Sequence, residues 1–265
     1  MMVQTRKELL QSAALEAGAC IRDFFGRDLN IKKKGELDLV TQADEAAEQV
    51  IVDAIAAHFP GDGILAEEGS SREGKTGFHW IIDPLDGTTN FAHGFPHFSV
   101  SIGVAQNGRV RHGIVYDPVK QELFEAHEGE GARLNGKAIR VAGKTELGES
   151  LSVTGFSYDR RLRLPELLGR TERMLQHCQG FRRLGSAALD LAYIACGRFD
   201  IFLEDRLNPW DIAAGQLLVL EAGGAVCGFD GGPVDLAAGH ILACNPSLAP
   251  KALAMLVGPY PSSRG

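Results

Sequence analysis

The spacing of apolar residues changes at Pro60, and this change constrains the fold more than any other feature of the sequence. Before Pro60, apolar residues recur every three or four positions over residues 9–21 and 47–55. This spacing predicts two amphipathic helices, the first ending near Gly26 and the second beginning after an N-cap at Thr41. Beyond Pro60, short apolar runs bounded by turn residues predict strands; these lie at 64–66, 80–82, 99–105, 109–116 and 122–127.

Turn signals then divide the chain. Asn107-Gly108 is a strong hairpin signal, and Asn135-Gly136 predicts a further tight turn. A polar stretch at 143–150 is the best candidate boundary. Beyond it, strands and helices alternate, with strands expected at 151–154, 180–184 and 201–203 and helices at 164–178, 186–196 and 211–222. We therefore expect a layered α/β fold, with an N-terminal half at 1–145 and a C-terminal half at 146–265 in one compact unit.

Composition narrows the class of protein. The 265 residues are 45% hydrophobic and 23% charged, which excludes a disordered, collagenous or coiled-coil chain. No apolar run approaches the roughly 20 residues of a membrane span. The five scattered cysteines indicate mostly buried free thiols in a reducing cytoplasm. A formal net charge of −7 does not attract nucleic acid or an anionic membrane. An anionic substrate would therefore need local cations.

The segment from Trp80 to Phe91 carries the most chemical information. An apolar strand is followed by Asp83 and Asp86, two carboxylates that repel each other unless one is protonated or a cation lies between them. Carboxylate oxygens suit Mg²⁺ rather than zinc, and the amides after Asp86 can hold a phosphate at a helix start. A plain turn leaves the second aspartate unexplained. The haloacid-dehalogenase signature has one residue between its aspartates, and this chain has two.

Other candidates look ordinary when each is considered alone. Asp211 follows Asn208-Pro209-Trp210 and can be explained by helix capping. Glu67 belongs to an adjacent Glu pair of the kind that is usually solvated, and Asp44 lies at a helix start. Residues Lys32, Lys33 and Lys34 would normally form a solvated loop. Their occurrence in one order around the Asp83–Asp86 motif gives them significance.

Taken together, these residues resemble the inositol monophosphatase family, the lithium-sensitive Mg²⁺-dependent sugar-phosphate phosphatases. Both signature segments are present, at 80–91 and at 210–215 continuing to 221–224, and the similarity runs from about Leu10 to Gly258. The tract from Gly185 to Tyr193 is most similar to the bacterial branch. The resemblance implies a layered α-β-α-β-α sandwich, usually a homodimer, in the cytoplasm.

The resemblance also implies a metal site. Glu67, Asp83 and the Leu85 carbonyl would hold a first Mg²⁺, and Asp83, Asp86 and Asp211 a second. A third, weaker ion would share Glu67 through water. Mn²⁺ is a substitute for Mg²⁺, and Li⁺ and Ca²⁺ are expected inhibitors. Bound divalent ions would reverse the charge of an acidic pocket. They would supply the local cations that an anionic substrate needs in a protein of negative net charge.

Catalytic and substrate roles follow from the same resemblance. Thr88, hydrogen-bonded to Asp44, would orient and help deprotonate the attacking water, and Glu67 completes the catalytic set. The Gly87 and Thr88 amides would hold the phosphate, and Lys33 matches a mobile basic loop, with Lys32 or Lys34 as alternatives. The residues expected to bind substrate are Asp86, Gly87, Thr88, Gly185, Ser186, Ala187, Glu204 and Asp211.

The substrate is left open among related phosphate monoesters. Glu204 precedes Asp211 by seven residues. Family members that hydrolyse inositol phosphates have this spacing, so the resemblance favours myo-inositol monophosphate. Fructose 1,6-bisphosphate and histidinol phosphate are alternatives with the same mechanism. Some bacterial relatives act as binding factors in transcription antitermination, so the arginines at 160, 161, 163, 182 and 183 could serve a protein or RNA surface. We favour instead solvated charges or salt bridges across a subunit interface, and expect no association with nucleic acid, RNA polymerase or membrane.

Overall fold

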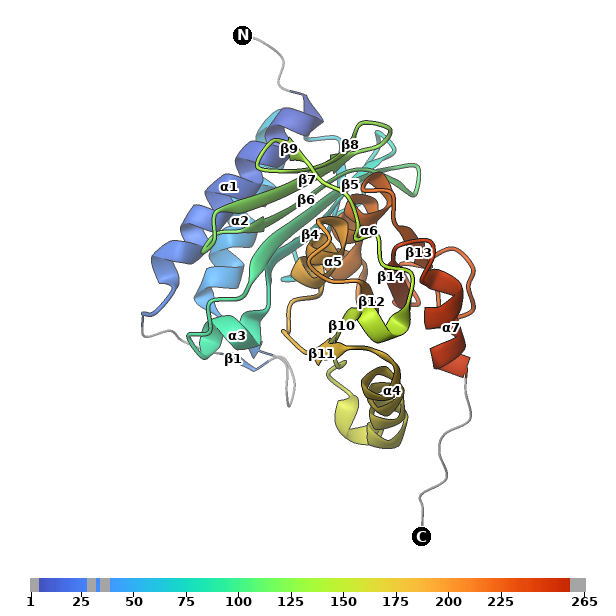
Figure 1. Ribbon diagram of the computed structural model, residues 1–265. Helices are drawn as coiled ribbons and strands as arrows, with labels where there is room; N and C mark the ends of the chain where they lie inside the picture. Colours follow the sequence, from blue (N-terminus) through green and yellow to red (C-terminus); the bar gives the residue numbers. More distant parts are fainter. Residues whose placement is uncertain (1–4, 28–31, 34–38, 258–265) are drawn as a thin grey trace.

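A computed structural model describes residues 5–27, 32–33 and 39–257. The chain folds into five layers, α-β-α-β-α (Figure 1), as expected. A seven-stranded sheet forms from the first half of the chain and a five-stranded sheet from the second. Two helices cover the outer face of the first sheet, two lie between the sheets, and two cover the outer face of the second.

The outer layer of the first sheet consists of α1 (Arg6–Phe24) and α2 (Gln42–His58). Thr5 and Thr41 close capping boxes with Glu8 and Asp44, which fixes where each helix begins. The apolar faces of both helices pack against the sheet, α1 on β5 and β6 and α2 on β4. Both predicted helices are confirmed.

The seven-stranded sheet has the order β3-β4-β5-β6-β7-β8-β9, with β3 and β4 parallel and the other pairs antiparallel. Asn107 and Asn135, each followed by a glycine, have positive φ angles in the turns β5–β6 and β8–β9, as predicted. The strands are β3 (Gly63–Ala66), β4 (Phe78–Asp86), β5 (Ser99–Gln106), β6 (Arg109–Asp117), β7 (Glu122–His127), β8 (Gly131–Leu134) and β9 (Lys137–Ala138).

The five-stranded sheet has the order β11-β10-β12-β14-β13, with β10 parallel to β11 and β12, and β14 antiparallel to β12 and β13. On its outer face lie α4 (Leu164–His177) and α7 (Ala249–Val257). The strands are β10 (Leu151–Thr154), β11 (Gly180–Arg182), β12 (Ile201–Glu204), β13 (Ala225–Cys227) and β14 (Ile241–Cys244). The sequence did not predict β8, β9, β13, β14 or α7.

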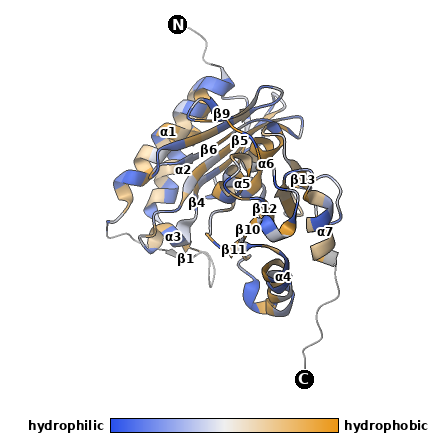
Figure 2. Cartoon of the chain, in the orientation of Figure 1, coloured by the Kyte–Doolittle hydropathy of each residue, from blue (hydrophilic) through white to orange (hydrophobic). Residues whose placement is uncertain are grey.

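The central layer consists of α5 (Ala187–Ala195) and α6 (Pro209–Glu221). Every residue of α5 is buried, and both helices are strongly apolar (Figure 2), because each contacts sheets on two sides. The largest apolar cluster joins Phe124 of the first sheet to Phe202 of the second through these helices. The start of each central helix is therefore held rigidly between the two sheets.

Smaller elements complete the fold. The short strands β1 (Lys32–Lys33) and β2 (Leu39–Val40) pair with each other, and α3 (Thr88–Ala92) follows β4. The 3₁₀ turns are η1 (Leu147–Glu149) and η2 (Arg160–Leu162). The expected boundary at 143–150 contains η1 and is tied to the C-terminal region, since Asn245 donates a hydrogen bond to the Lys144 carbonyl.

Two further expectations can be compared with the structure. All five cysteines are free thiols, but only Cys244 is buried and the other four are partly exposed, so the expectation of mostly buried thiols was wrong. They lie at or near the ends of their elements, where apolar neighbours cover them incompletely. In the described parts of the chain, no helix combines the length and apolarity needed to cross a bilayer.

Candidate functional site

Three carboxylates from distant parts of the chain meet at one point. One oxygen from each of Asp83, Asp86 and Asp211 lies within 4.8 Å of the others. The sequence placed the first two after a strand, whereas β4 continues through Asp86 with an irregularity between Asp83 and Asp86. Across it, three steps along β4 oppose two steps along β5, from Ser101 to Ser99. The extra residue offsets the alternation of the strand, so carboxylates three apart reach the same side of the sheet.

Asp86 connects the two halves of the chain. Its Oδ2 accepts hydrogen bonds from the Ser186 hydroxyl at 2.6 Å and the Ala188 amide at 2.7 Å, both at the start of α5. Burial raises the pKa of Asp86 to about 6, although these hydrogen bonds act in the opposite direction. The predicted site residues Asp86, Ser186 and Ala187 therefore lie together.

Asp211 has two roles in the structure. At the start of α6, its Oδ2 accepts a hydrogen bond from the Asn208 amide at 2.6 Å, which closes a capping box. The same side chain belongs to the carboxylate cluster. Burial, followed by the charges of Asp86 and Glu67, raises the pKa of Asp211 well above its usual range. Capping is thus part of its role rather than the whole of it.

Glu67 and Leu85 lie at the edge of this cluster. The Glu67 amide follows β3 and donates to the Ile82 carbonyl of the neighbouring strand at 3.2 Å, which sets Glu67 beside Asp83. Burial, then the charges of Glu67 and Asp86, raises the pKa of Asp83 well above its usual range. The Leu85 amide donates to Asp83 Oδ1 at 3.0 Å, and the Leu85 carbonyl lies at the same distance from the Thr88 hydroxyl oxygen, as a second acceptor within reach of its single proton.

The expected contact between Thr88 and Asp44 is present. The Thr88 hydroxyl lies 3.0 Å from Asp44 Oδ1 and can donate to it. The other oxygen of Asp44 accepts from the Thr41 amide at 2.9 Å and the Thr41 hydroxyl at 2.6 Å, so the cap of α2 holds Asp44 in place. Burial raises the pKa of Asp44, against the hydrogen bonds from Thr41 and Thr88.

Gly87 makes the turn between β4 and α3. Its φ angle is +100°, and a Cβ there would lie 3.0 Å from the His97 carbonyl oxygen. Any other residue would therefore be strained at this position. The turn brings the Gly87 and Thr88 amides to the start of the short helix α3, immediately after Asp86.

These residues open onto a cavity of about 260 Å³. All the residues expected to bind substrate line it, whereas Asp44, Glu67, Asp83 and Leu85 lie outside its lining. Glu204, at the end of β12, is packed so closely on Gly155 that a Cβ on Gly155 would lie 2.1 Å from its Oε2. Burial raises the pKa of Glu204 to about 8, while the charge of Arg183 acts in the opposite direction.

The sequence interpretation missed one wall of the cavity. Residues 155–158 form this wall together with Arg160, Arg183 and Arg206. A signal was available, because the strands ending at Thr154 and Glu204 are parallel and their carboxyl ends meet at one sheet edge. Asp190 of α5 was also missed; it is buried, and desolvation followed by the charge of Glu204 raises its pKa well above its usual range.

The structure describes only part of the segment that contains the three lysines. The structure describes the backbone of Lys32 and Lys33 in β1, and Lys34 lies outside the described residues. Which of the three approaches the site therefore stays a prediction.

The chemistry of the cluster fits divalent cations. Its donors are carboxylate oxygens, which Mg²⁺ and other hard cations prefer. Within the described part of the chain, no Lys or Arg forms an ion pair with Asp83, Asp86 or Asp211. Buried carboxylates without a counter-charge repel each other and raise each other's pKa, and a bound cation would remove both effects. The fold and site thus define a layered α/β protein built around a buried carboxylate centre.

Comparison with known proteins agrees with this class. The inositol monophosphatase family matches residues 2–259. An inositol-1-monophosphatase of Synechocystis is 46% identical over 245 residues, covering 92% of this chain and 85% of that protein. A protein of Escherichia coli named Nus factor SuhB is also 46% identical over 245 residues, covering 91% of this chain and 92% of that protein. The solved inositol monophosphatase of Anabaena has a TM-score of 0.87 and 42% identity, covering 98% of this chain and 99% of that one. The chain belongs to the inositol monophosphatase family.

Proposed function

We propose that this protein is a Mg²⁺-dependent phosphomonoesterase that hydrolyses myo-inositol monophosphate and related polyol phosphates. The observation that carries the proposal is the convergence of Asp83, Asp86 and Asp211 beside a cavity lined by Ser186 and Glu204. Carboxylates suit divalent cations at one end of such a cavity, and polar side chains suit the hydroxyl groups of a polyol at the other.

Glu67, Asp83 and the Leu85 carbonyl would hold one cation, and Asp83, Asp86 and Asp211 a second. When bound, Mg²⁺ lowers the pKa of water and stabilises negative charge on the transferring phosphoryl group. The carboxylates of the chain fix where this charge is placed. The Gly87 and Thr88 amides, at the start of α3, are available to hold phosphate oxygens.

The Thr88–Asp44 hydrogen bond supports a role for Thr88 in orienting the attacking water. The hydroxyl donates to Asp44 at 3.0 Å, so its lone pair is free to accept a proton of the water. The water would pass one proton through Thr88 to Asp44 as its oxygen bonds to phosphorus and the bond to the polyol oxygen breaks. The departing polyol oxygen would take a proton from solvent water. We expect Thr88→Ala to lower kcat while Mg²⁺ affinity is retained. Thr145→Ala, at an exposed threonine outside the cavity lining, is the matched control.

The test of function is phosphate release from myo-inositol 1-phosphate, fructose 1,6-bisphosphate, histidinol phosphate and adenosine 3′,5′-bisphosphate, each with Mg²⁺ and with chelator. Mg²⁺-dependent preference for inositol 1-phosphate is the expected outcome, with inhibition by Li⁺ through competition for a Mg²⁺ position. Turnover of none of these esters by metal-loaded protein would reject the proposal.

Fructose 1,6-bisphosphate is a second candidate substrate because Arg160, Arg183 and Arg206 line the cavity. A second phosphate group on the substrate could pair with these guanidinium groups. Replacing Arg160 with Gln separates the two candidates. It should raise KM for the bisphosphate and leave KM for the monophosphate almost unchanged if the bisphosphate is the substrate.

A regulatory role in transcription is a second candidate function, favoured by the 46% identity to the E. coli protein named Nus factor SuhB. Asp83→Asn distinguishes it from catalysis. In a host that depends on the protein, a binding role survives the loss of turnover caused by this substitution, and an enzymatic role does not.

The proposed homodimer gains support from the surface of α4. Leu164, Leu168 and Leu175 are about half exposed or more and follow helical spacing, and Leu162, just before the helix, is 87% exposed. We place these leucines in the dimer interface. Light scattering should give twice the chain mass for the natural protein and the monomer mass for Leu168→Glu.

We also propose that residues 1–145 and 146–265 unfold as one unit, because the largest apolar cluster draws on both halves. A single cooperative transition, observed alike by tryptophan fluorescence and by circular dichroism, is expected. Two separate transitions would contradict the proposal.

A further inference from the structure

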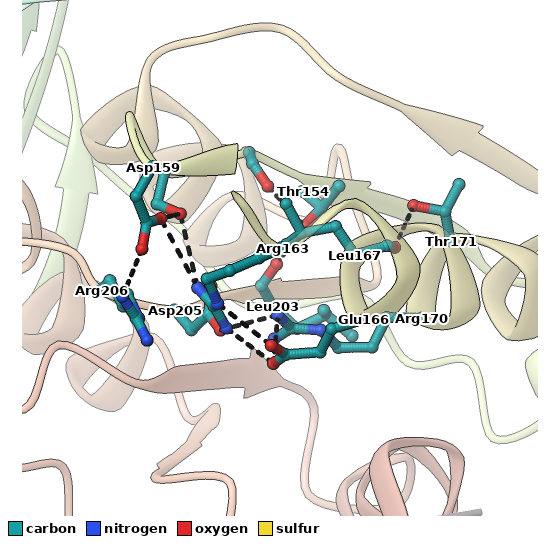
Figure 3. Close-up of polar contacts among 12 residues, drawn as sticks. Thr154, Asp159, Arg163, Glu166, Leu167, Arg170, Thr171, Leu203, Asp205 and Arg206 are labelled. Atoms are coloured by element: carbon teal, nitrogen blue, oxygen red, sulfur yellow. Dashed lines mark hydrogen bonds and ion pairs between the residues drawn. The ribbon is translucent and has the colours of Figure 1, made fainter. Parts of the chain in front are cut away.

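An ion-paired group lies next to the cavity, and of its members only Arg206 lines the cavity (Figure 3). We call it the Asp205 cluster; its members are Asp159, Arg163, Glu166, Arg170, Asp205 and Arg206. Asp205 accepts from Arg163 Nη2 at 2.5 Å and from Arg170 Nη2 at 2.6 Å. The side chain of Asp205 is only 3% exposed, and those of the two arginines are 11% and 8% exposed. The expectation that Arg163 is solvated or pairs across a subunit interface was therefore wrong.

The cluster joins the two segments that form the missed wall of the cavity. On one side is the segment 155–163, which includes residues 155–158 and Arg160 of the lining. On the other side is the end of β12, where Asp205 directly follows Glu204 and precedes Arg206. Arg163 pairs with Asp205, and Arg206 pairs with Asp159. Asp205 and Arg206, which follow β12, thus pair with Arg163 and Asp159 of the segment 155–163.

The backbone of the segment is fixed to β12 at its first end and forms local turns beyond it. Thr154, the last residue of β10, is fixed to β12 because its hydroxyl donates to the Leu203 carbonyl. From Ser157 to Arg163, three backbone hydrogen bonds are local: Arg160 donates to the Ser157 carbonyl, Leu162 to the Asp159 carbonyl and Arg163 to the Arg160 carbonyl. Turns of this kind do not fix a segment relative to a neighbouring strand. The ion pairs to Asp205 and Arg206 provide that connection.

We infer that Asp205 is a positioning residue for substrate selectivity: through Arg163 and Arg170 it holds the wall at 155–163 at a fixed distance from Glu204. The inference rests on the proposed phosphatase function. Asp205 touches neither substrate nor cation. Its effect is to keep the wall in the arrangement that fits the polyol ring, while Asp83, Asp86 and Asp211 are held independently by β4 and α6.

The test compares two esters in three variants. Asp205→Asn removes the charge that joins the two arginines. Asp159→Asn removes the outer pair from the side that does not line the cavity; Asp159 is more exposed than Asp205, so this variant should fold even if the first does not. Arg198→Gln is the matched control, because Arg198 makes a bidentate pair with Glu122 whose members do not line the cavity. The esters are myo-inositol 1-phosphate, which has ring hydroxyls to be placed, and p-nitrophenyl phosphate, which has none.

We expect KM for inositol 1-phosphate to rise about tenfold in Asp205→Asn and about threefold in Asp159→Asn, the cost of misplacing one or a few hydrogen bonds. KM for p-nitrophenyl phosphate and kcat for both esters should stay within about twofold of the natural protein, as should all values for Arg198→Gln. Equal losses on both esters, or an unchanged KM for inositol 1-phosphate in both folded variants, would overturn the inference.

Amide hydrogen exchange tests the positioning without turnover. The two cluster variants should exchange faster over residues 155–163 than the natural protein, and Arg198→Gln should not. If the natural protein hydrolyses neither ester, the proposed function fails, and the exchange measurement still decides the structural claim. Unchanged exchange over 155–163 in both cluster variants would overturn it.

Discussion

Two groups of buried carboxylates near the cavity have opposite electrostatic surroundings. Asp83, Asp86 and Asp211 face each other, and burial together with neighbouring negative charge raises the pKa of Asp83 and of Asp211. Asp205 is as buried as Asp83, and burial acts to raise its pKa too, but hydrogen bonds and charge from Arg163 and Arg170 lower it overall. Within the described residues, the first group makes no ion pair, although the charge of Arg183 acts to lower the pKa of Asp86. The second group is paired directly with two arginines.

This electrostatic difference distinguishes carboxylates that can bind a cation from a carboxylate that stabilises the protein structure. A buried carboxylate paired with arginine is satisfied inside the protein, and breaking the pair leaves a charge stranded in a medium of low polarity. A group of unpaired buried carboxylates is costly until something from solution neutralises it, and this is the condition for a cation site. The same residue type thus holds the cavity wall in one group and is available to ligands in the other.

The largest effect is expected on turnover in the unpaired group. Asp211→Asn should lower kcat at least about a thousandfold, because it removes a ligand charge with little change in side-chain size. Phosphate release from myo-inositol 1-phosphate at saturating Mg²⁺ measures this. Asp230→Asn, at an exposed aspartate, is the control. Wild-type turnover in Asp211→Asn would remove Asp211 from the metal site.

Stability should change in opposite directions in the two groups. Asp205→Asn removes the buried partner that Arg163 and Arg170 share and leaves both paired only with more exposed carboxylates, so it should lower the free energy of unfolding by about 3 kcal/mol. Asp83→Asn should raise it in chelator, by about 1 kcal/mol, because mutual repulsion decreases. Urea unfolding with EDTA measures both.

Mg²⁺ sharpens this comparison. Added Mg²⁺ should stabilise the natural protein and Asp205→Asn alike, and should lose most of its effect in Asp83→Asn. Arg198→Gln, at a partly exposed pair, should change the free energy of unfolding by less than about 1 kcal/mol. Destabilisation of Asp83→Asn in chelator as large as that of Asp205→Asn would erase the distinction between the groups.

The sequence predicted the unpaired group well and the paired group poorly. Local strand, turn and helix signals located the segments that carry Asp83, Asp86 and Asp211. The resemblance to the family brought these residues together and placed Asp44 beside Thr88, a contact that the structure contains. Arg163 and Asp205 are 42 positions apart on irregular segments. Periodicity says nothing about such a pair, since a charged loop residue has the same local pattern whether it is solvated or buried against a partner.

The helices and strands also differ in how well the sequence predicted them. Helices with a clear apolar stripe and the strands joined by Asn-Gly were predicted within a few residues of their bounds. The strands β13 and β14 are short, and the residues between them are rich in Gly and Asp, so pairing with β12 rather than local preference creates them. The irregularity in β4 was also unpredicted, because Pro84 signals a break in hydrogen bonding but not the direction in which the next carboxylate points.

The smallest effect concerns pH and the neighbouring residues Glu204 and Asp205. The pKa of Glu204 is raised to about 8 by burial, above its unfolded value near 4.5. The folded state therefore keeps the proton longer, and this stabilisation is complete below pH 4.5 and is lost as the pH rises through 8. At about 1.4 kcal/mol per pH unit, the natural protein should lose about 2 to 3 kcal/mol from this group between pH 5 and 7 in chelator.

Glu204→Gln isolates this contribution, because the amide does not titrate. The free energy of unfolding of Glu204→Gln minus that of the natural protein should increase between pH 5 and 7 by this amount. The pKa of Asp205 is lowered, so its stabilisation is present above its usual value of 3.8 and is lost only as the pH falls below it. The corresponding difference for Asp205→Asn should therefore be constant between pH 5 and 7. A difference for Glu204→Gln that is equally constant would mean that Glu204 is ionised in the folded protein. Its partner would then be Arg183, whose charge already acts to lower the pKa of Glu204.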